Sequence, residues 1–228
     1  MDIKGAVAVV TGANRGIGYA FARALLEHGA ARVYAGARDP GKVTDPDLIP
    51  LRLDVTRPDE VAAAAVTAGD ATIVINNAGV GGTTSRLLEG DFDGARQAME
   101  VNYLGTWAVA RAFAPVLARN GGGALVSMLS LASWAAMPVA PGYAASKAAQ
   151  WSLTDSLRQV LREQGTLVVG VHSGFVDTDL SAWTDAPKIS AADVAEQTML
   201  AIAGDLSEVL ADEPTRQVKS ALSRPLNA

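Results

Sequence analysis

The sequence predicts a single α/β domain, a parallel sheet of about seven strands with helices on both faces. Two observations lead to this fold class. Short apolar runs rich in β-branched residues alternate with longer helical stretches along the chain. The chain also has 228 residues, of which 49% are hydrophobic, so it can bury one large core. We see no linker, repeat or low-complexity segment, so one domain is expected over residues 1–228.

The first third of the chain supplies three strands and a helix. Residues 7–11 form an apolar run of strand length. Residues 17–28 have the periodicity of a helix, and Gly29 suits its C-terminal end. Two further β-branched runs predict strands at 32–37 and 49–53.

The middle third begins with an alanine-rich helix, because Pro58 is typical of a first-turn position. A fourth strand is predicted at 72–76, where the residues are again β-branched. A long helix follows over about 92–119. The glycine-rich turn at 120–123 ends it.

The last third repeats the alternation. Strands are predicted at 124–129 and 166–172, separated by a long helix at 143–164. A helix near 191–203 and a short strand near 208–211 complete the pattern. Right-handed crossovers between such strands give a doubly wound sheet, the Rossmann arrangement.

Composition excludes several classes of protein. Without cysteine there is no disulfide framework and no thiolate metal site, and His28 and His172 are too far apart in sequence to suggest a metal site. A net charge of −5 without a basic run argues against nucleic acid as a partner. We find no signal-peptide core and no membrane-spanning run, so a cytoplasmic protein without membrane contact is expected.

A glycine-rich loop lies between the first strand and the first helix, and it reads Thr11-Gly12-Ala13-Asn14-Arg15-Gly16-Ile17-Gly18. Glycines let the backbone turn tightly against a pyrophosphate, and the helix N-terminus supplies free N–H donors. The spacing is T-G-x-x-x-G-x-G rather than G-x-G-x-x-G. A plain strand-to-helix turn is the alternative, so the loop indicates a dinucleotide site only together with other motifs.

The end of the second strand indicates which dinucleotide is bound. An acidic residue there would hold the ribose 2′-hydroxyl of NAD, but no carboxylate precedes Arg38. The guanidinium groups of Arg38 and Arg15 suit the 2′-phosphate of NADP. Asp39 follows directly and is expected to point past the strand end. The sequence therefore favours NADP(H) over NAD(H), and the alternative is that both arginines are solvated surface residues.

Tyr143 and Lys147 stand four residues apart at the start of a predicted helix, so they share one helix face. A nearby ammonium lowers the pKa of a phenol. Tyr143 could then donate a proton to a carbonyl oxygen or take one from an alcohol. Two solvated helix residues are the alternative interpretation.

Four motifs in order and spacing resemble the short-chain dehydrogenase/reductase family. They are the glycine loop, Asn76-Asn77-Ala78-Gly79 after the fourth strand, Ser130 thirteen residues before Tyr143, and Lys147. The match extends from about residue 6 to 180, and the remainder suits the family's last helix and strand. The resemblance implies the Rossmann fold and an oxidoreductase that uses a nicotinamide cofactor.

The resemblance also implies a role for each matching catalytic residue. Ser130 would orient and polarise the substrate oxygen, and Tyr143 would be the general acid/base. Lys147 would tune Tyr143 and hold the nicotinamide ribose. Asn102 resembles the family's helix asparagine, whose main-chain carbonyl holds a water that links Lys147 to solvent. The alternative for Asn102 is a mildly unfavourable residue in the middle of a helix.

The cofactor contacts implied by the resemblance extend beyond the glycine loop. Asp54 resembles the residue that contacts adenine, although it could instead cap the following helix. Ser173 stands where the family usually has proline, while Val176 and Thr178 are retained. The residues expected to bind NADP(H) are Gly12, Asn14, Arg15, Gly16, Ile17, Gly18, Arg38, Asp54, Val55, Asn77, Ala78, Gly79, Tyr143, Lys147, Gly174, Val176 and Thr178.

The segments around the predicted substrate position are apolar. Residues 131–142 contain few polar groups, and Phe175, Leu180 and Trp183 add apolar side chains from the opposite loop. Such a lining favours an apolar or aromatic substrate, with ordinary packing or subunit contacts as the alternative. Family members are usually dimers or tetramers joined through the two long helices, so a homodimer or homotetramer is expected.

These observations together predict an NADP(H)-dependent oxidoreductase. It would reduce a ketone or aldehyde to an alcohol, or run the reverse reaction, by hydride transfer with Tyr143 as general acid/base. The alternative from another class is an NADP(H)-binding redox sensor or regulatory protein with little turnover. An epimerase or dehydratase that retains its nicotinamide is less favoured.

Overall fold

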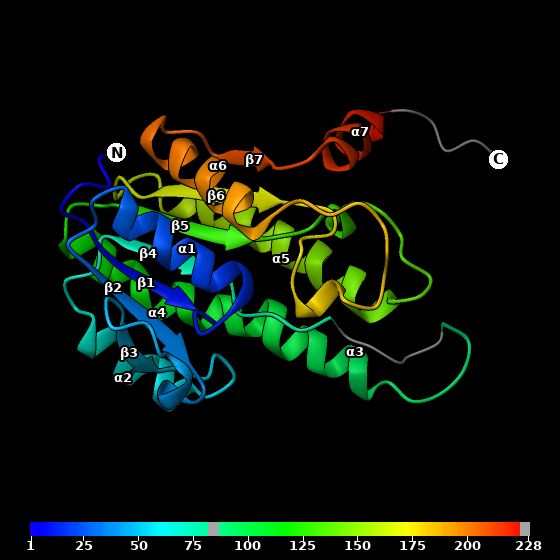
Figure 1. Ribbon diagram of the computed structural model, residues 1–228, viewed down its shortest axis with the longest axis horizontal. Coiled ribbons are helices and arrows are strands. Elements are labelled where there is room, and N and C mark those ends of the chain that lie inside the picture. Colours follow the sequence, from blue (N-terminus) through cyan, green and yellow to red (C-terminus); the bar gives the residue numbers. More distant parts are fainter. Residues whose placement is uncertain (82–86, 224–228) are drawn as a thin grey trace.

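Seven parallel strands form one sheet within residues 1–81 and 87–223, which the computed structural model describes (Figure 1). Their order across the sheet is β3-β2-β1-β4-β5-β6-β7. The strands are β1 Val7–Thr11, β2 Arg32–Ala37, β3 Ile49–Arg52, β4 Ile73–Asn76, β5 Ala124–Met128, β6 Leu167–His172 and β7 Glu208–Leu210. The predicted doubly wound sheet is confirmed.

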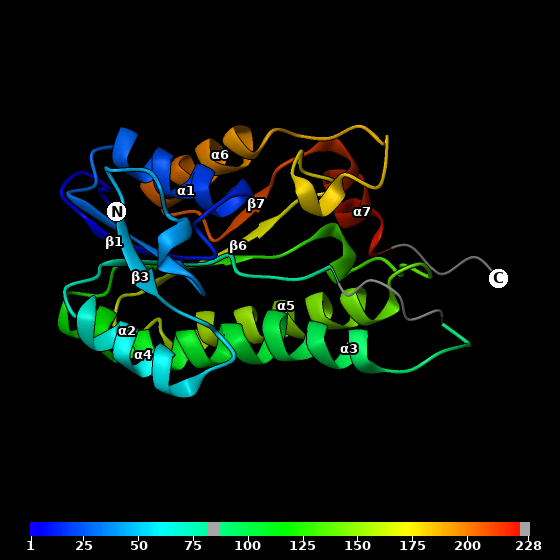
Figure 2. The ribbon, with the colours of Figure 1, turned by 60° about the horizontal axis from the view of Figure 1, so that its bottom comes forward.

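Helices cover both faces of the sheet, as Figure 2 shows. One face carries α1 and α6, and the other carries α2, α4 and α5. The helices are α1 Gly16–Glu27, α2 Pro58–Thr67, α3 Asp93–Ala98, α4 Thr106–Arg119, α5 Pro141–Val160, α6 Ala191–Ala203 and α7 Glu213–Ala221. In the part of the chain that the structure describes, no helix is long and apolar enough to cross a membrane.

The core consists of two apolar clusters, one on each face of the sheet. Neighbouring residues of a strand point to opposite faces, so Ile75 belongs to the same cluster as Phe21 of α1, while Val74 belongs to that of Phe113 of α4. Phe113 is fully buried in this core, whereas Trp107 on the same helix is 45% exposed. Burial on both faces explains why these strands read as continuous apolar runs.

The sheet reverses its strand order between β1 and β4, which are hydrogen-bonded neighbours. From β1 the chain moves one way to β2 and β3, and from β4 it moves the other way to β5, β6 and β7. The loops that leave β1 and β4 therefore diverge and open a crevice at the carboxyl ends of the strands. This crevice is where a doubly wound sheet places its ligand.

The long helix predicted at 92–119 is interrupted. It consists of α3, a π-helical turn at Met99–Gly105, and α4. Such turns insert one extra residue and are frequent at functional sites. The helix predicted at 143–164 begins earlier, at Pro141, and ends at Val160.

The sequence prediction did not include α7, because this helix has only nine residues and most of them are polar. Its start does carry a local signal. The Asp212 carboxylate accepts a hydrogen bond from the Thr215 N–H at 2.9 Å, and Pro214 occupies the first turn. An acidic cap followed by proline is typical of a helix N-terminus.

Candidate active site

A cavity of about 680 Å³ opens at the crevice between the two halves of the sheet. Every residue that the sequence named as a dinucleotide contact lines it. Ser130 and Asn102 are not among the lining residues, and they are only 6% and 0% exposed. The described residues bring together no cluster of three or more His, Cys, Asp or Glu that could hold a metal ion.

The glycine loop shapes the floor of this cavity. Gly12 and Gly16 have φ values of +66° and +57°, a region that favours glycine. A Cβ on Gly18 would lie 2.2 Å from the carbonyl oxygen of Gly12, so only glycine fits there. Arg15, the N-cap of α1, makes no side-chain capping bond, and the first turn has no acidic residue. The helix N-terminus therefore offers uncommitted N–H groups to an anion.

Thr11 and Asn77 tie the loop after β1 to the loop after β4. The Thr11 hydroxyl accepts hydrogen bonds from the backbone N–H of Asn77 and of Ala78, both at 2.9 Å. The Asn77 amide donates back to the Thr11 carbonyl at 2.9 Å. The sequence predicted Asn77 as a cofactor contact. In the structure Asn77 also holds together the two loops that border the crevice.

At the outer end of the cavity, Arg38 lines the wall while Asp39 turns away. The Asp39 carboxylate accepts a hydrogen bond from the Gly41 N–H at 3.1 Å and caps the following turn. Arg15 pairs with Asp179 across the cavity at 2.8 Å. Both partners of this ion pair are more than two-thirds exposed, so the pair contributes less than about 1 kcal/mol.

Asp54 lines the cavity beside Val55 but does not cap a helix. Its carboxylate accepts hydrogen bonds from the backbone N–H of Thr56 at 3.0 Å and from the Thr56 hydroxyl at 2.8 Å. The N-cap of α2 is Arg57, so the helix-capping alternative for Asp54 is wrong. The local turn holds the carboxylate in place at the cavity.

Ser130 follows β5 directly, and Tyr143 and Lys147 lie in the first two turns of α5. The Ser130 hydroxyl oxygen accepts a hydrogen bond from the Ala132 N–H at 3.1 Å. This leaves the hydroxyl proton free to donate to another group. The Lys147 Nζ lies 5.9 Å from the centroid of the Tyr143 ring.

Burial controls the pKa values of both Tyr143 and Lys147. It raises the pKa of Tyr143 above the ordinary 10.0, and hydrogen bonding with Ser130 opposes this by a smaller amount. It also lowers the pKa of Lys147 to about 7. The expectation that Lys147 lowers the pKa of Tyr143 is therefore wrong for this state of the protein, because burial disfavours the charged form of each group.

Asn102 lies in the π-helical turn, fully buried. Its side chain forms two hydrogen bonds with the backbone of Val80, one to the carbonyl at 3.0 Å and one from the N–H at 2.8 Å. It also donates to the Ser146 hydroxyl at 2.9 Å. The Asn102 main-chain carbonyl, which the resemblance assigned to a water, accepts a hydrogen bond from the Thr106 hydroxyl at 2.8 Å. Asn102 thus joins the loop after β4 to α5.

Three residues that the sequence did not single out, Met128, Gln150 and Thr106, join this cluster. The Lys147 ammonium donates to the Met128 carbonyl and to the Gln150 side-chain oxygen, both at 2.8 Å. The Gln150 amide nitrogen donates in turn to the Thr106 hydroxyl at 2.9 Å. Gln150 lies three residues after Lys147, on the buried face of α5. This spacing on one helix face is the sequence feature that could have predicted the contact.

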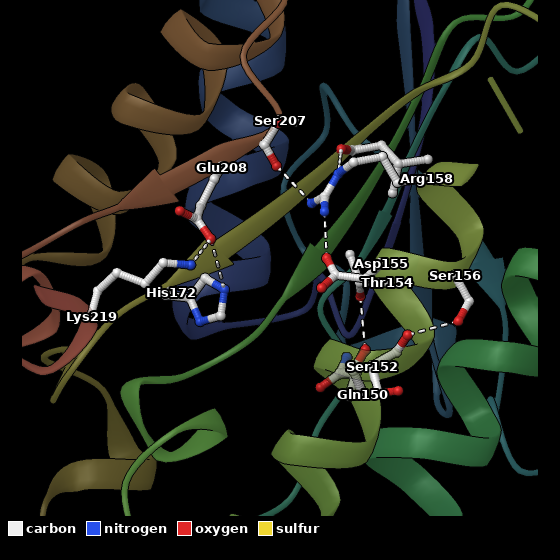
Figure 3. A network of polar contacts seen from close by, with 11 residues as sticks. Gln150, Ser152, Thr154, Asp155, Ser156, Arg158, His172, Ser207, Glu208 and Lys219 are labelled. Carbon is white, nitrogen blue, oxygen red and sulfur yellow. Dashed lines mark hydrogen bonds and ion pairs between the residues drawn. The ribbon is translucent and has the colours of Figure 1, made fainter. Parts of the chain in front are cut away.

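His172 supports Ser130 from the neighbouring strand. Its Nδ1 lies 3.1 Å from the Ser130 carbonyl oxygen, which can only accept, so Nδ1 carries the proton. The imidazole stacks on Trp134 with centroids 3.8 Å apart. Burial lowers the pKa of His172 to about 4. Figure 3 shows Glu208 between His172 and Lys219, and Lys219 binds its carboxylate at 2.8 Å.

The segment leading into α7 holds the loop after β6, which lines the cavity. The Asp212 carboxylate accepts a hydrogen bond from the Gly174 N–H at 2.6 Å. Ser173, which stands where the family has proline, is 2% exposed, and its carbonyl accepts a bond from the Leu131 N–H at 2.9 Å. Ser173 and Gly174 therefore connect the loop after β6 to the segment after β5 and to the start of α7.

Apolar side chains form part of the remaining wall of the cavity, beside polar residues such as Gln97 and Glu100. Met137 and Ala140 face the cavity from one side, and Phe175, Leu180 and Trp183 from the other. The Phe175 and Trp183 rings meet edge to face with centroids 5.6 Å apart. Trp183 is nevertheless 63% exposed. Trp134, by contrast, does not line the cavity but packs against His172.

Comparison with known proteins agrees with this geometry. Residues 6–188 match the family model described as short chain dehydrogenase. The chain is 31% identical over 202 residues to the short chain dehydrogenase pigC of Monascus ruber, covering 81% of this chain and 67% of that protein. It is 32% identical over 209 residues to an uncharacterized oxidoreductase of Staphylococcus aureus strain MRSA252, covering 86% of this chain and 90% of the other.

Two solved structures are also similar. A short chain dehydrogenase from Burkholderia cenocepacia J2315 in complex with NADP is 38% identical, with a TM-score of 0.94 over 98% of this chain and 95% of the other. A short-chain dehydrogenase/reductase from Burkholderia phymatum in complex with NAD is 26% identical, with a TM-score of 0.85 and full coverage of both chains. On these matches and on the residues described above, the chain belongs to the short-chain dehydrogenase/reductase family of oxidoreductases.

Proposed function

We propose that this oxidoreductase uses NADP(H) to interconvert a ketone or aldehyde and the corresponding alcohol. The observation that carries the proposal is that Tyr143 and Lys147 open onto the same cavity as the free N-terminus of α1. One end of that cavity suits an anionic dinucleotide, and the other end suits proton transfer to an oxygen.

The donor set of the cavity fits NADP(H). The uncommitted N–H groups of α1 would hold the pyrophosphate, and Arg15 and Arg38 would hold the 2′-phosphate. Asp54 would contact the adenine, and Val176 and Thr178 the nicotinamide end. The cofactor, when bound, supplies or accepts the hydride. The relative from B. cenocepacia, crystallised with NADP, supports this choice, whereas the relative from B. phymatum was crystallised with NAD.

The catalytic residues would then handle the substrate oxygen. Tyr143 has a raised pKa and is protonated at neutral pH, so it can donate its proton to a carbonyl oxygen as hydride arrives. The Ser130 hydroxyl, whose oxygen is held by the Ala132 N–H, can donate a second hydrogen bond to the same oxygen. Lys147 would orient the ribose and stabilise the phenolate that Tyr143 leaves.

The apolar wall supports an apolar or aromatic substrate. Phe175, Leu180 and Trp183 offer ring and branched surfaces close to the catalytic end of the cavity. Burying an aromatic substrate against them would contribute most of its binding free energy, while Ser130 and Tyr143 would select for an oxygen.

A homo-oligomer joined through the two long helices belongs to the same proposal. Leu104 and Trp107 are 43% and 45% exposed around the start of α4, and Tyr103 contacts Trp107 with ring centroids 5.9 Å apart. Light scattering on the purified protein gives the mass directly. Conversion to a monomer by Trp107→Glu would support the interface, and an unchanged mass would contradict it.

The function is tested by following oxidation of NADPH and NADH in parallel, with aliphatic, aryl and cyclic ketones and aldehydes. We expect turnover with NADPH that is lost in Tyr143→Phe. Binding of NADPH, measured separately by nicotinamide fluorescence, should survive that substitution. NADPH binding without turnover on any carbonyl would favour the redox-sensor alternative, and equal affinity for both cofactors would contradict the NADP preference.

A further inference from the structure

A continuous chain of buried side chains leads away from Lys147. The Lys147 ammonium donates to the Gln150 oxygen at 2.8 Å, and the Gln150 nitrogen donates to the Thr106 hydroxyl at 2.9 Å. The Thr106 hydroxyl donates to the main-chain carbonyl of Asn102 at 2.8 Å. Lys147, Gln150 and Thr106 are all at most 5% exposed, and Asn102 is fully buried.

The direction of every hydrogen bond in this chain is fixed. A main-chain carbonyl can only accept, so Thr106 must donate its hydroxyl proton to Asn102. Its oxygen then accepts from the amide nitrogen of Gln150, and the Gln150 oxygen is turned toward Lys147. The π-helical turn therefore sets the orientation of the Gln150 amide, and the amide orients the lysine.

Orientation matters because an ammonium has three N–H donors. Two of those of Lys147 go to Met128 and Gln150, so the direction of the third is fixed. Lys147 lines the cavity beside Tyr143, and that third donor is the one available to a ligand or to the phenol oxygen. Without Gln150, the ammonium could rotate about its bond to the Met128 carbonyl.

We propose that Gln150 is a positioning residue, which holds the Lys147 amine in its reactive orientation by joining it to Thr106 and the π-helical turn. The proposal rests on the function given above, since it concerns the same lysine. It differs from a water-mediated proton path, because an amide is neither an acid nor a base near neutral pH and orients its partner instead of relaying protons.

Gln150 is also neutral, and this matters for the charge on Lys147. A carboxylate at the same place would stabilise the ammonium, whereas an amide leaves burial as the main influence on the lysine. Among the described residues, Tyr143 on the same helix and His172 on β6 are titratable groups that interact with Lys147. Gln150→Glu therefore changes one charge in a defined position and tests the contact directly.

The first experiment uses the protein without cofactor, so it does not depend on turnover. The Cε resonance of Lys147, assigned with Lys147→Arg, is followed by NMR during a pH titration. We expect the midpoint to rise by more than one pH unit in Gln150→Glu and to fall in Gln150→Met, which keeps the side-chain length but accepts no comparable hydrogen bond. Identical midpoints in all three proteins would overturn the proposal.

The second experiment measures steady-state kinetics. Gln150→Met should lower kcat about tenfold, the loss expected for one hydrogen bond to a charged group, with KM values changed less than about threefold. Thr154→Val is the matched control, since Thr154 is buried one turn further along α5 and its hydroxyl donates to the main-chain carbonyl of Gln150, not to its side chain. We expect Thr154→Val to keep the wild-type kcat.

The two experiments separate the proposals. An equal loss of kcat in Gln150→Met and Thr154→Val, with equal losses of melting temperature, would mean general packing and would overturn the role of Gln150. Shifted titration midpoints in a protein without carbonyl turnover would support the contact and contradict the proposed function. Wild-type kcat in Gln150→Met would overturn the positioning role even where turnover is normal.

Discussion

The two ends of the cavity are built in different ways. The dinucleotide end depends on backbone geometry and on exposed charges, with Gly12, Gly16 and Gly18 shaping the loop and Arg15 pairing at the surface. The catalytic end depends on buried side chains that hold one another, such as Lys147 and Gln150. Changes at the catalytic end should therefore have large effects, whereas single charges at the dinucleotide end can be exchanged at smaller cost.

The largest effect is expected for Tyr143→Phe. Removing the hydroxyl leaves the substrate oxygen without its acid, so kcat should fall by a factor of about 10³ while NADPH affinity stays within a few-fold. Tyr103→Phe is the control, because Tyr103 lies on the π-helical turn and does not line the cavity. A comparable loss of kcat in Tyr103→Phe would mean that the effect is not specific to the catalytic end of the cavity.

The dependence of the free energy of unfolding on acidic pH should reveal the burial of His172. The native protein keeps this imidazole neutral down to a pKa of about 4, whereas the unfolded chain takes up a proton near 6.5. The free energy of unfolding should thus decrease as pH falls from 6.5 to 4, by on the order of 3 kcal/mol. In His172→Phe, which keeps a ring on Trp134, urea denaturation should show this slope reduced. An unchanged slope would assign the acid sensitivity to other groups.

Cofactor preference should respond to Arg38. Arg38→Asp is expected to weaken NADPH binding by about 10- to 100-fold and to leave NADH binding within a few-fold, since only NADPH carries the 2′-phosphate. Lys42→Asp makes the same charge change on an exposed residue outside the cavity. Fluorescence titration measures both affinities. An equal loss of NADPH affinity in Lys42→Asp would indicate a general effect of protein charge instead of a contact with the 2′-phosphate.

The smallest effect concerns the ion pair across the cavity. Asp179→Asn frees Arg15 for the 2′-phosphate, so NADPH should bind a few-fold more tightly. NADH, which lacks that phosphate, serves as the internal control. If both cofactors gained equally, loss of the Asp179 charge near the pyrophosphate would explain the result instead.

The sequence predicted what is local or periodic. The seven strands, the glycine loop and the placement of Tyr143 and Lys147 on one helix all follow from spacing. Contacts between distant segments do not leave such a pattern. Gln150 with Thr106, and Asp212 with Gly174, are 44 and 38 residues apart, and only folding brings them together.

The pKa of Tyr143 shows why chemistry is harder to predict than position. The sequence correctly indicated that Tyr143 and Lys147 share a helix face, but it could not say how deeply each group is buried. Burial acts on both groups and outweighs their proximity in this state. α7 was missed for a different reason, since a helix of nine mostly polar residues gives only a weak periodic pattern.

The burial of Lys147 is also expected to make its amine a better nucleophile at neutral pH than that of a surface lysine. An amine with a pKa of about 7 is half neutral at that pH, and a neutral amine attacks an aldehyde and expels water to form an imine. The lysine lines the cavity, so a small aldehyde can meet it there when no dinucleotide is bound. Reduction of this imine by borohydride would then label Lys147 covalently in the protein without cofactor.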